Sequence, residues 1–199
     1  HKKLQIQEHD MLFLDKEEIK KVLSTAETHF PNFYPILLTA ITTGLRQGEI
    51  LALQWKDIDF EKKAITVNKT LYRNKIQAPK TKHSYRQVNM PDILCDILIK
   101  FRKNDEDIVF PNQKGNYTDP NNMVKRYFKP CLKLAGVKEI RFHDLRHTFA
   151  SLIIAKGADP KYIQCQMGHY SCQMSFDRYG HMMPDSSDKY RNILNDIKN

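Results

Sequence analysis

The hydrophobic residues of this chain follow a helical period along most of its length, with one interruption early in the sequence. Between Trp55 and Met90, apolar and polar residues instead alternate in three short runs, at 58–60, 65–67 and 86–90. Alternation of this kind is typical of half-buried strands. The pattern predicts an α+β fold that is mostly helical, with a small three-stranded antiparallel sheet inserted early in the chain.

Capping residues and glycines mark the helix boundaries. Asp15, followed three residues later by Glu18, predicts a capping box at the start of the first helix. Gly44, Gly136 and Gly157 offer C-terminal stops. These signals predict helices after Asp15, over 31–43, from 46 onward, over 93–102, 121–134, 143–156, 160–167 and 171–179, and after 184.

The length of 199 residues suits one domain with short arms, and a hydrophobic fraction of 41% is enough to fill one core. We expect residues 1–14 to be a linker from a missing N-terminal region, because they mix charged and apolar groups without a period. Residues 15–185 form the expected domain. Residues 186–199 are expected to form a C-terminal tail helix. Its apolar side chains recur at helical spacing and form a stripe of Tyr190, Ile193, Leu194 and Ile197. Through this stripe the helix packs either in cis on its own domain or in trans on a neighbouring protomer.

Basic residues outnumber acidic ones, at 32 Lys and Arg against 23 Asp and Glu, which gives a net charge of +9. A folded basic surface indicates a polyanionic partner such as nucleic acid, although charge alone does not decide the matter. An apolar run of about 18 residues is absent from the sequence, as is the pattern of a signal peptide. We therefore expect a soluble, cytosolic protein without a membrane partner.

Four cysteines occur, and none is paired in a CxxC motif. That spacing argues against a zinc site and against a disulfide framework. The cysteines are interpreted as buried or neutral thiols in a reducing compartment: Cys95, Cys131, Cys165 and Cys172.

The segment FHDLRHTF, at 142–149, carries the most informative pattern. At about 100° per residue, His143, Arg146 and His147 fall on one face of a helix, while Leu145 and Phe149 fall on the opposite face. One face is expected in the core, and the other holds two histidines and an arginine. Taken alone, this helix is equally compatible with a solvated polar face.

Three further segments place reactive groups beside core elements: TGLRQGE at 43–49, PKTK at 79–82, and MGH at 167–169, followed ten residues later by Tyr179. Together with the segment at 142–149, they resemble the tyrosine recombinase family, in order and at similar spacing. The resemblance extends from about Asp15 to Asp185. The amino-acid sequences of these motifs are most similar to those of integrases of temperate phages and conjugative transposons.

The resemblance implies that the chain is a site-specific DNA recombinase, which cuts and rejoins strands through a covalent 3′-phosphotyrosine without a metal, ATP or other cofactor. The catalytic positions implied are Arg46, Lys80, His143, Arg146, His169 and Tyr179. Glu49 matches an acidic position of the family that supports the first of these arginines, Arg46. Lys82 remains an alternative to Lys80 as the catalytic lysine. Met167 stands where Leu is commoner in the family, and Gly180 where Ser is commoner.

These residue types suit phosphoryl transfer on physical grounds. Guanidinium forks bind the non-bridging phosphate oxygens bidentately and stay charged. Lys80 can protonate the leaving 5′ oxygen, and neutral His143 can accept or relay the phenol proton of Tyr179. His169 can donate a hydrogen bond to the phosphate. His147 matches no catalytic position of the family, and we expect it to have a structural or phosphate-contacting role.

As partners, the resemblance implies double-stranded DNA at attachment or transposon-end sites, further copies of the chain in a tetramer on DNA, and an accessory excision factor, all in the cytoplasm of a bacterial host.

Three other classes of protein are alternatives to a recombinase. A type IB topoisomerase uses a similar catalytic set, whereas a helix-turn-helix protein would give no reason for that set. A metallonuclease would require acidic residues at ligand spacing near the histidines.

Overall fold

The computed structural model describes residues 12–78, 85–102, 107–169, 171 and 179. Its elements follow in this order: α1 (Lys16–His29), α2 (Tyr34–Thr43), α3 (Gln47–Leu51), η1 (Trp55–Asp57), β1 (Ile58–Asp59), β2 (Ala64–Val67), β3 (Thr70–Tyr72), β4 (Lys75–Gln77), β5 (Arg86–Asn89), α4 (Asp92–Phe101), α5 (Pro120–Met123), η3 (Val124–Phe128), α6 (Lys129–Leu134), α7 (Asp144–Ile154) and α8 (Pro160–Met167). The predicted α+β fold, mostly helical with a small sheet, is confirmed.

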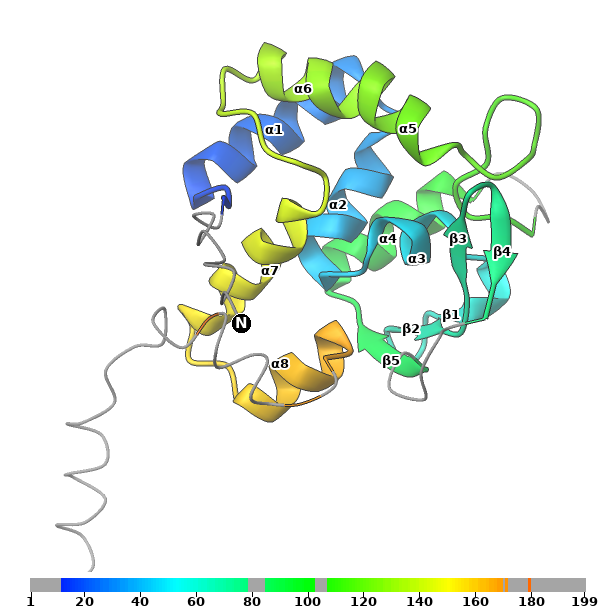
Figure 1. Cartoon of the computed structure of the whole chain (residues 1–199), viewed down its shortest axis with the longest axis vertical. Coiled ribbons are helices and arrows are strands. Elements are labelled where there is room, and N and C mark those ends of the chain that lie inside the picture. The colour runs from blue at the N-terminus through cyan, green and yellow to red at the C-terminus, as the bar shows by residue number, and fades with distance from the viewer. Residues whose placement is uncertain (1–11, 79–84, 103–106, 170, 172–178, 180–199) are drawn as a thin grey trace, which may run out of the picture.

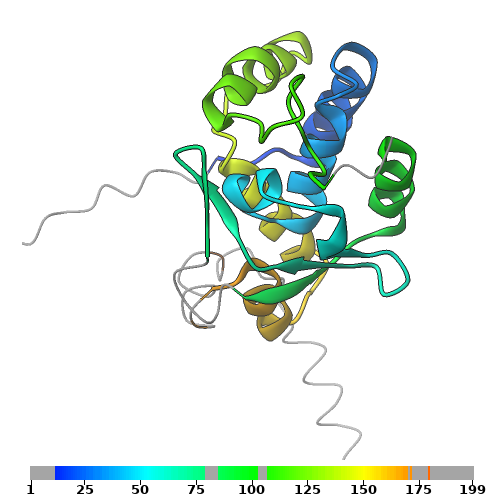
Figure 2. The ribbon, with the colours of Figure 1, turned by 90° about the vertical axis from the view of Figure 1, so that its right-hand side faces the viewer.

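Helices α2 and α7 pass through the centre of the molecule and pack on each other. In Figure 1, α1 and α6 lie together at the top, while the sheet and the β3–β4 hairpin lie on the right. Most helices lie on one side of the sheet in Figure 2, and α8 lies against β5. Helix α2 is buried on nearly all sides, so it carries apolar residues around its whole circumference.

The helix signals in the sequence are largely confirmed. Asp15 caps α1 and forms the predicted capping box with Glu18. Gly44 ends α2 with φ of 65°, and a Cβ at this position would lie 2.4 Å from the Phe149 ring. Both the backbone conformation and the space therefore require glycine there. Helix α2 begins at Tyr34, later than the predicted residue 31, with Pro35 in its first turn.

The three-stranded antiparallel sheet is also confirmed, in the order β1-β2-β5. Ile58 pairs with Ile65, and Ile65 pairs in turn with Val88. All three side chains are buried, because the alternating pattern places them on the core face. The sheet brings β5, which begins shortly after the PKTK segment at 79–82, next to α8.

A second, two-stranded sheet of β3 and β4 was missed by the sequence analysis. Its turn consists of Arg73 and Asn74, which both have positive φ, at 48° and 58°. Two-residue hairpin turns of this kind usually contain glycine, and the sequence offers none here. The segment also lacks alternation, because every side chain of β4 is exposed.

The helix predicted over 121–134 is divided into α5, the π-helical segment η3 and α6. Pro130 stands at the start of α6 and has no N–H to donate to the preceding turn. A π-helical turn before it accommodates the lost hydrogen bond without ending the helix. The helices predicted over 171–179 and after 184 lie outside the described residues, except for Ser171 and Tyr179.

A small second cluster of buried apolar residues joins α7 to α8, apart from the main core. Phe149, Ala150 and Ile154 of α7 contribute to it, together with Ile163 and Met167 of α8, and Tyr179 completes it. The alternative of a solvated polar face on the helix over 143–156 does not hold, because the polar side chains of Arg146 and His147 are buried too. On that face, Arg146 contacts Met167 at the end of α8, and His147 contacts Tyr179.

Among the predicted buried or neutral thiols, Cys95 and Cys131 are buried. Burial raises the pKa of Cys131 to about 11, which keeps that thiol neutral. Cys165 is exposed, so of these two alternatives it is not a buried thiol, and Cys172 lies outside the described residues. Within the described ranges, no helix is long and apolar enough to cross a membrane.

Candidate active site

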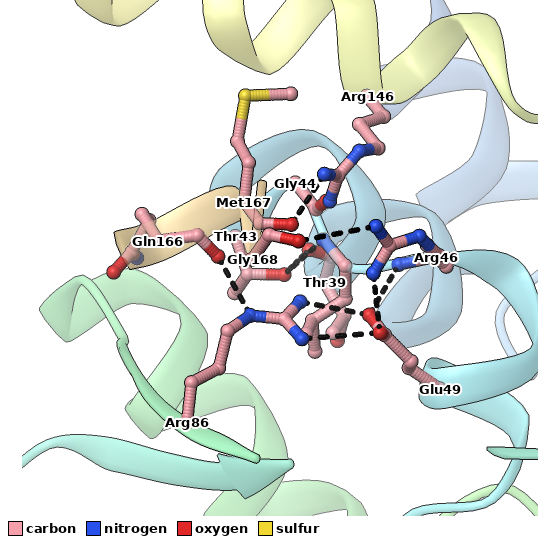
Figure 3. Close-up of polar contacts among 11 residues, drawn as sticks. Thr39, Thr43, Gly44, Arg46, Glu49, Arg86, Arg146, Gln166, Met167 and Gly168 are labelled. Atoms are coloured by element: carbon pink, nitrogen blue, oxygen red, sulfur yellow. Dashed lines mark hydrogen bonds and ion pairs between the residues drawn. The ribbon is translucent and has the colours of Figure 1, made fainter. Parts of the chain in front are cut away.

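The end of α8 is a meeting point for three arginines that come from distant parts of the sequence (Figure 3). Arg86 donates from Nε to the carbonyl of Gln166 at 3.0 Å, and Arg46 donates from Nη2 to the carbonyl of Gly168 at 3.3 Å. Arg146 donates to the carbonyl of Met167, which lies between them. The last carbonyls of a helix lack partners within it and carry partial negative charge, so they attract cations.

Glu49 holds two of these arginines from the opposite side. Its Oε1 and Oε2 accept from Nη1 and Nη2 of Arg86 at 3.1 and 2.8 Å, and Oε1 also accepts from Nη1 of Arg46 at 2.9 Å. Burial alone would raise the pKa of Glu49, but the hydrogen bonds and charges of Arg86 and Arg46 outweigh it and lower the pKa to about 2. Glu49 is therefore a carboxylate at neutral pH and acts as neither acid nor base.

Arg146 is buried more deeply than Arg46, with only 4% of its surface exposed. Its Nη1 donates to the carbonyl of Gly44 at 2.6 Å, which fixes the guanidinium against the end of α2. Burial, and then the Arg46 cation, lower the pKa of Arg146 to about 9. The guanidinium is therefore still protonated at neutral pH. By contrast, the Arg46 side chain is 39% exposed, so it can reach a ligand on the surface.

The beginning of α7 is fixed by a buried carboxylate. Asp144 accepts from the backbone N of Arg141 at 2.8 Å and from its Nη2 at 2.7 Å. Thr148 donates to the carbonyl of Asp144 at 3.1 Å and accepts from the backbone N of Leu14 at 3.0 Å. These contacts fix where the helix begins and how it is oriented about its own axis, and so fix the directions of His143, Arg146 and His147.

Three histidines and a tyrosine extend the site beyond the arginines. Nδ1 of His147 lies 2.7 Å from the hydroxyl oxygen of Tyr179, which is 1% exposed. The ring of His169 stacks on that of Tyr179, with centroids 6.4 Å apart and planes 7° apart. The ring of His143 meets that of His147 edge-on at 5.5 Å. Partial burial, and then Arg146, lower the pKa of His143, which is thus neutral at neutral pH.

Comparison with known proteins decides the family. The sequence model of the phage integrase family matches residues 12–185. The chain belongs to the phage integrase family. A tyrosine recombinase XerC-like protein of Caldanaerobacter subterraneus subsp. tengcongensis is 32% identical over 91% of this chain and 53% of its own length. The integrase of ICEBs1 from Bacillus subtilis is 32% identical over 98% of this chain and 57% of its own length.

The fold is shared with solved members of the family. The Tn1549 transposon integrase, in complex with circular intermediate DNA, matches with a TM-score of 0.77 and 26% identity, over 98% of this chain and 69% of that one. The catalytic domain of bacteriophage HP1 integrase matches with a TM-score of 0.68 and 22% identity, over 94% and 98%. This chain spans about half the length of the curated relatives it matches.

The structure of this phage integrase family member brings together five of the six residues that the sequence pointed to as catalytic. Lys80, the sixth, and its rival Lys82 lie outside the described residues. The five that gather around the end of α8 are Arg46, His143, Arg146, His169 and Tyr179. Glu49 lies against Arg46, as expected of a supporting carboxylate. The catalytic roles of these residues stay predictions.

One residue of the site, Arg86, and one contact, that of His147, were not recognised from the sequence. Arg86 is the first residue of β5, shortly after the PKTK segment at 79–82, and its side chain is only 6% exposed. An arginine at the start of a predicted half-buried strand was a signal that it is paired with an acid. His147 was expected to have a structural or phosphate-contacting role, and the sequence did not indicate that its ring would lie against the Tyr179 hydroxyl.

The site gathers more cations than anions. In the part of the chain that the structure describes, no group of three His, Cys, Asp or Glu residues is placed to hold a metal ion. The guanidinium groups of Arg46 and Arg86 pair with the carboxylate of Glu49, whereas that of Arg146 donates to the carbonyls of Gly44 and Met167. Such an arrangement can bind an oxyanion through several fixed donors, next to a phenol that can act as a nucleophile.

Proposed function

We propose that this chain carries the catalytic part of a site-specific DNA recombinase, an integrase that cleaves and rejoins strands through a covalent 3′-phosphotyrosine on Tyr179. The observation that carries the proposal is the gathering of Arg46 and Arg146 on the end of α8, within the same site as the phenol of Tyr179. Fixed guanidinium forks stabilise charge on a phosphate under attack. The relatives named as integrases support the same reading.

In this proposal each group has one role. Arg46 and Arg146 hold the non-bridging oxygens of the scissile phosphate, and His169 donates a further hydrogen bond to it. Lys80 gives a proton to the leaving 5′ oxygen. His143, held neutral, can relay protons near the phosphate. Because the phosphotyrosine keeps a phosphodiester bond, a 5′ hydroxyl can rejoin the strand with neither ATP nor a metal.

The remaining assignments are also proposals. Residues 1–14 serve as the linker, residues 15–185 as the catalytic domain, and residues 186–199 as the tail helix. The partners are double-stranded DNA at attachment or transposon-end sites, other copies of the chain in a tetramer on DNA, and an accessory excision factor. The net charge of +9 supports the DNA partner. The reaction integrates or excises a phage or another mobile element in the cytoplasm of a bacterial host.

Covalent capture tests the proposed reaction. The chain is incubated with a pool of nicked duplexes of random sequence around the nick, so that the cleaved fragment diffuses away and the protein stays attached. We expect a DNA adduct that survives denaturation and forms in EDTA. Tyr179→Phe should abolish the adduct, because it lacks the attacking oxygen, whereas Tyr162→Phe, on the exposed side of α8, should not. An adduct formed by Tyr179→Phe would overturn the assignment of the nucleophile.

A further inference from the structure

The hydroxyl of Tyr179 lies on a histidine that the proposed mechanism does not use. Nδ1 of His147 is 2.7 Å from that oxygen, a hydrogen-bond distance suited to proton transfer. Both side chains are buried, with 1% of Tyr179 and 6% of His147 exposed. Their rings are inclined at 57°, with centroids 5.8 Å apart. The contact is therefore made inside the protein.

A tyrosine nucleophile needs a group that removes its proton. The unperturbed phenol pKa is about 10, so only about one phenol in a thousand is ionised at pH 7. The sequence pointed to His143 for this step. The hydrogen bond runs instead to His147, one helical turn later on α7, whose ring meets the His143 ring edge-on.

A buried carboxylate lies close to His147 on the same helix. Asp144 lies three residues earlier on the same helix, is fully buried, and interacts electrostatically with His147. That carboxylate is itself held in place by Arg141. A fixed negative charge beside the ring stabilises the imidazolium that forms when the ring accepts a proton.

We propose that His147 is a catalytic residue: its Nδ1 orients the Tyr179 hydroxyl and accepts the phenol proton as the oxygen attacks the phosphate. The proposal rests on the proposed function. The bond between the phenol oxygen and phosphorus forms, and the bond between phosphorus and the 5′ oxygen breaks. The phenol proton passes to Nδ1 of His147, while the 5′ oxygen takes a proton from Lys80. In strand rejoining, His147 returns its proton to the departing phenol oxygen.

The first test compares His147→Asn and His147→Gln with the unchanged chain, on the duplex that the unchanged chain captures most readily. An asparagine amide reaches the position of Nδ1 and can hold the hydroxyl, but it cannot take a proton. We expect the single-turnover rate of adduct formation to fall about 100-fold or more in both variants, with DNA affinity unchanged. His29→Asn, at the exposed end of α1, is the matched control and should keep the normal rate.

A second substrate separates the two proton transfers. With sulfur in place of the bridging 5′ oxygen, the leaving group needs no proton. The defect of Lys80→Ala should then largely disappear, whereas that of the His147 variants should remain. A normal rate in a folded His147→Asn, or recovery of its rate on the sulfur substrate, would overturn the proposal. If the unchanged chain formed no adduct at all, the proposed function itself would fail, which is a different outcome.

Discussion

Individual residues in the site are placed by charge as much as by packing, and Glu49 illustrates this. Its pKa of about 2 in the folded chain lies below the ordinary value of 4.5. A depressed carboxylate pKa contributes stability that is fully present above the unfolded value and is lost as pH falls through the folded value. The difference corresponds to about 3 kcal/mol.

We therefore expect the free energy of unfolding to fall steeply between about pH 4.5 and pH 2, and this fall to be shallower in Glu49→Gln. The variant should also be less stable at neutral pH, since Arg86 would then be buried without its charge partner. Denaturant unfolding across this pH range provides the measurement. Glu61→Gln, at an exposed position, is the control, and an equal acid dependence in all three proteins would contradict the expectation.

The shape of the guanidinium group matters as well as its charge. Arg46→Lys keeps the positive charge but replaces a planar fork by a single ammonium. We expect the rate of covalent adduct formation to fall about 100- to 1,000-fold in this variant, while DNA affinity changes little. Single-turnover capture of a nicked duplex measures the rate. A near-normal rate would assign Arg46 to a purely structural role.

Among the elements, α8 has the greatest influence on the site, and Gly168 at its end is the sensitive position. Gly168 has φ of 60°, and a Cβ there would lie 3.0 Å from the Arg86 guanidinium. Gly157 has φ of 75° but nothing within 4 Å of its Cβ position. Both alanine variants should lose about 1 kcal/mol from backbone strain. We expect only Gly168→Ala to slow adduct formation as well, because it displaces Arg86; equal rates in the two variants would refute this.

The helices and the three-stranded sheet could be predicted because their signals are local: caps, terminal glycines and periods of 3.6 or 2. The β3–β4 hairpin with its turn at Arg73 and Asn74 was missed, because the turn conformation does not require glycine when asparagine can adopt it. The grouping of Arg46, His143, Arg146, His169 and Tyr179 followed from the family's motifs. The pairing of Arg86 with Glu49, like that of His147 with Tyr179, depends on which atoms meet in space, and spacing along the chain does not give that.

On the scale of the whole molecule, the excess of positive charge should govern DNA binding. Each phosphate that the chain neutralises releases counterions, so affinity falls as salt rises. If about four phosphates are contacted, raising salt from about 50 to about 200 mM should weaken binding on the order of 100-fold. Fluorescence anisotropy with a labelled duplex measures this. Tight, sequence-selective binding that salt does not affect would contradict an interaction dominated by the DNA backbone.

The small apolar cluster between α7 and α8 holds the site residues together, and its free energy of opening can differ from that of the main core. Parts of a protein with few buried contacts open locally at a lower free energy than the whole. Opening of this cluster would withdraw the carbonyls of Gln166, Met167 and Gly168 from their arginines and release Tyr179 in the same event. Amides of α8 should accordingly exchange with solvent hydrogen faster than those of α2 or α7. The reactive site would then last only as long as one short helix stays docked, so the chain could lose and regain its chemistry without unfolding its core.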